Sequence, residues 1–230
     1  MKNIKRIFTY LLGFFILAMG INISKQSGLG ISPVSSIPYS LELVWGIELG
    51  IATYFVYSVV ILLQMIILRK NYKIRNLLQI VSTFILGTLI TYTSTNYLLF
   101  WLPAPSNYVF RLIYLFISII VIGVGASLFL MSNIMPLPAE GLSAAIVQAS
   151  NDKIKFGDSK TMVDSIMVFI STLLSIIFLG KIQTVREGTV LAAIFVGKVV
   201  GILMRKYNQP LLDWFDKGEF INLNSDETVA

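Results

Sequence analysis

Residues 108–131 read YVFRLIYLFISIIVIGVGASLFLM, an apolar run with a single charged side chain, Arg111. A helix that crosses a bilayer needs about 20 consecutive, mostly apolar residues. Inside the hydrocarbon every backbone amide must be bonded within the protein, so only helices or closed barrels span, and a run of this length is far too long for a barrel strand. The run therefore predicts a transmembrane α-helix and an all-α membrane fold.

Further apolar runs of similar length surround this one. Hydrophobic residues make up 56% of the 230-residue chain and charged residues only 13%, against about 25% charged in an average soluble domain. Together the runs predict a polytopic helix bundle with about six transmembrane helices. The other predicted spans are 7–23, 49–68, 77–100, 160–179 and 188–205.

The residue types that are missing exclude several kinds of chemistry. The chain has no Cys and no His, which excludes thiol nucleophiles, disulfides, Cys/His metal sites and imidazole acid–base catalysis. The remaining carboxylates are isolated in the sequence, and no nucleotide-binding loop is present. We therefore expect a protein that is not an enzyme and that carries no cofactor and no metal.

The positive charges indicate an orientation in the membrane. A net charge of +6 could point to nucleic acid in a soluble protein, but here Lys and Arg gather between the apolar runs, as they do in cytoplasmic loops. The first run follows Lys2, Lys5 and Arg6 and is too long for a cleaved signal, so it is expected to remain as a span. This pattern predicts cytoplasmic N- and C-termini, contact with the lipid bilayer and no nucleic-acid partner.

The chain also divides into two similar halves. A shift of 108 residues places Ala18 on Ala126 and Ser35 on Ser143, and each half contains a span, a Gly/Pro break, a short segment and two more spans. Three spans per half require the halves to face opposite ways. We therefore predict one transmembrane domain, 1–205, built from inverted three-helix repeats at about 7–100 and 108–205 and followed by a short cytoplasmic tail, 206–230.

Each half is interrupted by a short helix-length segment. The segments 33–46 and 139–150 are too short to cross a bilayer, so each is expected to be either a re-entrant helix or an interfacial helix. Ser32 suits the N-cap position and Pro33 the first turn of the first segment. If the segments are re-entrant, their free N-terminal amides favour an anionic or carbonyl-bearing ligand. Paired broken segments of this kind mark binding sites in transporters.

Two short motifs resemble a known family. They are Gly28-Leu29-Gly30-Ile31-Ser32-Pro33 and Val185-Arg186-Glu187-Gly188-Thr189-Val190, the second followed by Gly197. Both resemble the YitT/YczE-like group of bacterial multi-pass membrane proteins, over roughly residues 7–205. The second half departs from that group, because Pro138-Ala139-Glu140-Gly141 replaces a more typical proline–aspartate pairing. The resemblance implies the bacterial plasma membrane and carries no established chemistry.

Ionisable and hydroxyl groups in the spans and breaks are the candidate site residues. A charge inside a span usually faces a cavity or a partner. Asp164 and Lys198 lie at similar expected depth, so we predict an Asp164–Lys198 pair facing the interior, with proton or ion coupling as one use. A structural ion pair, or Lys198 snorkelling to the surface, is the alternative. The full substrate- or ion-binding set is Ser32, Pro33, Ser35, Glu42, Glu140, Ser143, Asp164 and Lys198.

These features favour a small-solute transporter or permease with its site between the repeats. The alternative is a non-transporting membrane scaffold or regulatory partner, which predicts a packed interior without a polar cavity. The sequence leaves open whether a homo-oligomer or a partner membrane protein completes the assembly, and it does not identify the substrate, the direction of transport or the coupling ion.

Overall fold

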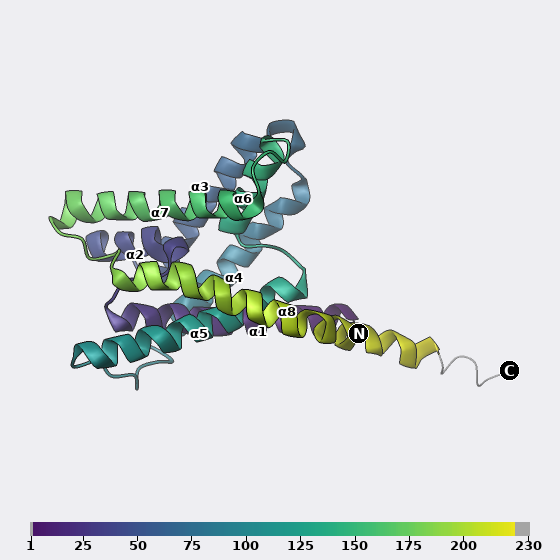
Figure 1. Cartoon of the computed structure of the whole chain (residues 1–230), viewed down its shortest axis with the longest axis horizontal. Helices are drawn as coiled ribbons and strands as arrows, with labels where there is room; N and C mark the ends of the chain where they lie inside the picture. Colours follow the sequence, from purple (N-terminus) through teal and green to yellow (C-terminus); the bar gives the residue numbers. More distant parts are fainter. Residues whose placement is uncertain (1, 224–230) are drawn as a thin grey trace.

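The computed structural model describes the backbone of residues 2–223 and the side chains of residues 3–215. All regular structure in this range is helical, as Figure 1 shows. The elements are α1 (Lys2–Ser27), α2 (Pro33–Trp45), α3 (Leu49–Leu68), η1 (Arg69–Asn71), η2 (Ile74–Leu78), α4 (Gln79–Tyr92), α5 (Tyr108–Ser132), α6 (Pro138–Ala149), α7 (Phe156–Leu179) and α8 (Glu187–Leu223).

The described part of the chain contains six helices that are long and apolar enough to cross a membrane. They correspond to α1, α3, η2 with α4, α5, α7 and the apolar part of α8, so the predicted all-α, six-span fold is confirmed. Their outward faces carry many exposed large apolar side chains, among them Phe55, Phe84 and Phe169. Lipid is the solvent in which such faces are stable.

Two predicted boundaries are displaced. The third span was predicted to reach residue 100, but α4 ends at Tyr92 and residues 93–102 form turns. The tail was predicted to begin at 206, but α8 continues through Pro210 to Leu223. Phe215 in this extension is fully buried, with its ring under the Arg6 guanidinium. Residues 224–230 of the predicted tail lie outside the described residues.

Helices α1 and α5 form the centre of the bundle and run antiparallel. Gly13 lies against Phe129 and Gly125, and Gly20 lies against Ile122. Residues later in α1 therefore contact residues earlier in α5. Small residues allow the two backbones to approach closely. Next to this crossing, the rings of Phe14 and Phe129 are 5.4 Å apart between centroids. This pair of helices joins the first half of the chain to the second.

The two short helices pack on the opposite halves of the chain. Helix α2 packs on α7, and α6 packs on α3, while each also contacts the long helix that follows it. In Figure 1, α2 and α7 lie above the layer of α1, α5 and α8. This exchange is the packing that a two-fold relation between the halves would give. It supports the prediction of two repeats.

Helix α2 begins in the middle of the bundle. Its Ser36 carbonyl accepts a 3.0 Å hydrogen bond from Ser171 Oγ of α7, and Ser40 Oγ lies 2.7 Å from the same hydroxyl. At the end of α2, the Trp45 ring packs against the Phe178 ring near the end of α7, with 5.0 Å between the ring centroids. The two helices are therefore parallel, and α2 starts about halfway along α7. This course fits a re-entrant helix better than an interfacial helix.

The first turn of α6 is also inside the bundle. The amides of Gln64 in α3 and Gln79 in α4 hydrogen-bond each other, and Gln64 also donates to the Pro138 carbonyl over 2.9 Å. Both glutamines are about 1% exposed. A Cβ on Gly141 would lie 2.8 Å from the Gln79 amide, so a larger residue here would displace the paired amides. Buried amides of this kind are stable only when paired, and here they position the start of α6.

Candidate functional site

A cavity of about 550 Å³ lies between the two halves. Small-molecule sites usually occupy about 300–1,000 Å³, so the cavity has room for a solute. The starts of both short helices line it, through the N-cap residue Ser32 with Pro33 and Ser35 of α2, and through Glu140 of α6. Apolar side chains cover much of the remaining wall. These include Leu17, Ile21, Leu86, Ile122, Phe129 and Val196.

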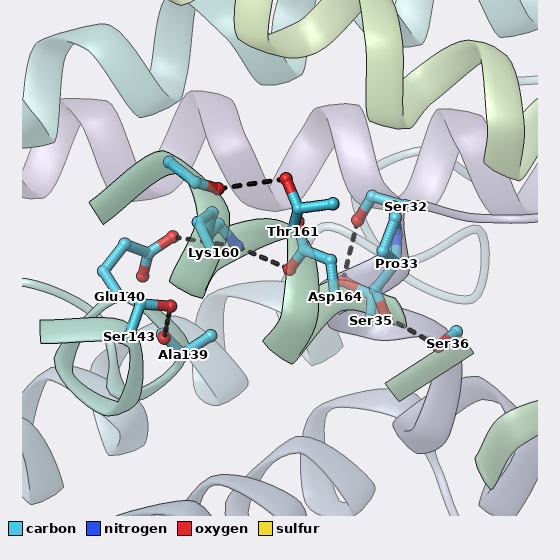
Figure 2. Close-up of polar contacts among 11 residues, drawn as sticks. Ser32, Pro33, Ser35, Ser36, Ala139, Glu140, Ser143, Lys160, Thr161 and Asp164 are labelled. Atoms are coloured by element: carbon cyan, nitrogen blue, oxygen red, sulfur yellow. Dashed lines mark hydrogen bonds and ion pairs between the residues drawn. The ribbon is translucent and has the colours of Figure 1, made fainter. Parts of the chain in front are cut away.

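Three charged groups form a cluster at one wall of the cavity. Lys160 of α7 donates a 2.6 Å hydrogen bond to Asp164, one helical turn further along, and its ammonium lies 3.9 Å from Glu140 Oε1. Figure 2 shows Lys160 between the two carboxylates. All three side chains are 20–25% exposed, which reflects the open space of the cavity. We call Glu140, Lys160 and Asp164 the charged cluster.

The two carboxylates of the charged cluster are not equivalent. Asp164 has the short ion pair with Lys160, whereas Glu140 has only the longer contact. The second oxygen of Glu140, Oε2, is buried and has no hydrogen-bond partner among the described residues. A buried polar atom without a partner is costly, so this oxygen is the place where the site is incomplete.

Hydroxyl groups continue the polar wall beyond the charged cluster. Ser32 Oγ donates to Ser35 Oγ over 3.3 Å, and both residues line the cavity with Asp164. In Figure 2 the Asp164 carboxylate lies between Lys160 and this serine pair. Pro33 at the first helical position leaves the turn without one amide, and the Ser35 amide donates to the Ser32 carbonyl over 3.0 Å. The start of α2 thus faces the same space as the charged cluster.

The predicted Asp164–Lys198 pair is wrong. Asp164 pairs with Lys160 on its own helix, and Lys198 is exposed with its ammonium 5.1 Å above the Phe195 ring. Similar depth did not bring the two charges together, because Lys198 is on an exposed face of α8. The exposed position agrees with the alternative of a surface-directed lysine.

Two other predicted residues lie outside the cavity lining. Glu42 forms a 2.6 Å ion pair with Lys25 and lines a separate, smaller cavity of about 70 Å³. Ser143 is fully buried and donates to the Ala139 carbonyl, and its own carbonyl accepts from Ser159 of α7. Both side chains hold helices in place in this structure.

The prediction missed Lys160, Thr161 and Tyr57 as lining residues. Lys160 is the first residue of the predicted span 160–179, so the sequence placed it at the membrane boundary rather than inside the bundle. Helix α7 begins four residues earlier, at Phe156. The spacing of Lys160 and Asp164, four residues apart, was the signal that could have found the pair.

Hydrogen bonds join neighbouring segments at the end of the bundle where α1 ends, which we call the opposite face. There Ser171 Oγ and Thr184 Oγ1 lie 2.9 Å apart, within hydrogen-bond distance, and the Gly188 amide donates to the Leu29 carbonyl over 2.8 Å. Arg186 also donates to the Gly28 carbonyl. At the other end, the N-terminal face, the lining includes Phe156, the half-exposed first residue of α7. The cavity therefore extends toward the N-terminal face.

The fold and this site define a multi-pass α-helical membrane protein with a mostly apolar cavity that contains a charged cluster. The chain belongs to a family of unknown function (DUF6198), whose model matches residues 4–205. It is also similar to the uncharacterized protein YyaS of Bacillus subtilis (strain 168), at 29% identity over 201 residues, covering 85% of this chain and 90% of that protein. No solved structure matches the chain. These matches do not name the YitT/YczE-like group, so that resemblance stays a prediction.

Proposed function

We propose that this protein is a small-solute transporter whose substrate site is the cavity between the two halves. The observation that carries the proposal is a charged cluster inside a membrane bundle, in a cavity lined by the first turns of two broken helices. Ionisable groups are rare within membrane helices and usually belong to a substrate or ion pathway. A scaffold would be expected to have a packed interior instead.

The charge pattern supports a location and an orientation. Lys and Arg are concentrated at the N-terminal face, including Arg69, Lys70 and Arg205, and cytoplasmic loops carry this bias. We place the protein in a bacterial plasma membrane with both termini cytoplasmic. The end of the cavity that Phe156 lines then faces the cytoplasm. The chain acts without catalysis, cofactor or metal, and any energy comes from an ion gradient or a partner subunit.

Transport is tested by filling the cavity. Ala144 lines it from α6, and Ala149 is exposed on the same helix outside the lining. Proteoliposomes containing the full chain are incubated with a mixture of small metabolites, and the contents are identified by mass spectrometry. We expect Ala144→Trp to abolish uptake of the imported solute and Ala149→Trp to retain it. Equal uptake by both variants, or no uptake above that of protein-free vesicles, would refute the proposal and favour the scaffold.

A further inference from the structure

The charge balance of the cavity limits which solute can enter it. Its ionisable lining residues, within the described part of the chain, are Tyr57 from α3, Glu140 from α6, and Lys160 and Asp164 from α7. With both carboxylates ionised, the charged cluster carries a net charge of −1 and repels an anion. With Glu140 protonated it is neutral, and the positive ends of α2 and α6 then dominate the field, each equivalent to about half a charge.

Glu140 is the residue best placed to take up a proton. Lys160 Nζ is 2.6 Å from Asp164 but 3.9 Å from Glu140, so Asp164 keeps its charge partner in either state. Glu140 Oε2 is buried without a partner in the described structure and can carry the added hydrogen. The N-terminus of α6 and Lys160 stabilise the ionised form, while burial in an apolar wall stabilises the neutral form. These opposing effects make Glu140 a residue that can change its protonation state during a transport cycle.

We infer that the cavity binds a small organic anion together with one proton, which is held by Glu140. The anionic group lies at the first turns of α2 and α6 beside Lys160, and an apolar body lies against side chains such as Ile122 and Phe129. The proton comes from water and bonds to Glu140 Oε2, and no other bond is made or broken. A monoanion and a proton cross together, so the cycle moves no net charge. This inference rests on the proposed transport function and names its substrate class and coupling ion.

Permanently charged probes test the inference, because their own charge does not change with pH. Benzenesulfonate and benzyltrimethylammonium are aromatic ions of similar size and opposite charge. Binding to the purified full chain is measured by calorimetry between pH 5 and 8, in buffers of different ionisation enthalpy. At pH values above the titration of Glu140, we expect benzenesulfonate to bind about tenfold more tightly for each unit by which the pH is lowered. Each bound benzenesulfonate should be accompanied by the uptake of one proton by the protein. The cation should bind at least tenfold more weakly at the lowest pH.

Variants separate this inference from the proposed function. Glu140→Gln mimics the protonated carboxyl, so it should bind benzenesulfonate with the same affinity at pH 5 and pH 8. Glu187→Gln, which changes an exposed carboxylate on the opposite face, should keep the wild-type pH dependence. Unchanged pH dependence in Glu140→Gln, or tighter binding of the cation, overturns the inference. If Ala144→Trp still abolishes uptake in that case, the transport proposal stands without it.

Discussion

The crossing of α1 and α5 gives the sharpest test of the packing. A Cβ added to Gly125 would lie 2.4 Å from the Leu17 amide nitrogen and 2.8 Å from the Gly13 carbonyl oxygen. Both are backbone atoms and cannot rotate away. Ordinary van der Waals contact begins near 3.4 Å, so Gly125→Ala must separate the two helices by about 1 Å. Overpacking of this kind costs about 1–3 kcal/mol.

The matched control is Gly197→Ala in α8, where the added Cβ meets nothing within 4 Å. Both substitutions gain about 0.5–1 kcal/mol from replacing glycine inside a helix, so this gain cancels in the comparison. We expect Gly125→Ala to be about 1–3 kcal/mol less stable than Gly197→Ala. The assay is equilibrium unfolding in mixed detergent micelles, followed by far-ultraviolet circular dichroism. Equal stability of the two variants would show that α1 and α5 do not cross closely at Gly125.

Two further predictions concern buried contacts. Gln64→Leu leaves the Pro138 carbonyl and the Gln79 amide without a partner, so it should cost about 1–3 kcal/mol of stability. Adding Gln79→Leu should recover part of this loss. A Gln64→Leu variant as stable as wild type in the same unfolding assay would contradict the prediction. Phe215→Ala removes a fully buried ring and should cost about 3–5 kcal/mol, more than truncation of the half-exposed Trp214. Equal melting temperatures of these two variants would place Phe215 outside the packed structure.

The transmembrane helices could be predicted because hydrocarbon imposes a length on apolar runs. The run 49–68 coincides with α3, for example. The extension of α8 could not be found this way, since it is polar enough to leave the bilayer and is held by Phe215 against Arg6. The end of α4 was missed because the predicted span was carried across the polar residues 93–96 to the apolar residues 98–100, beyond the point where the backbone turns.

The candidate site was predicted only in part. The breaks identified Ser32, Pro33, Ser35 and Glu140 as cavity residues, because a broken helix inside a bundle exposes its first turn. The partner of Asp164 was assigned wrongly. Sequence position gives the depth of a residue in a span but not the side of the helix on which it lies, and Lys198 is on the exposed side of α8.

The exchange of α2 and α6 between the halves has a consequence for synthesis. Helix α2 packs on α7, which begins at Phe156, more than a hundred residues later in the chain. At ~5–20 residues per second, the ribosome takes roughly 6–25 s to complete that interval. During this time the serine-rich face of α2 has no matching surface in the bilayer. The first half therefore stays incompletely packed until the second half arrives.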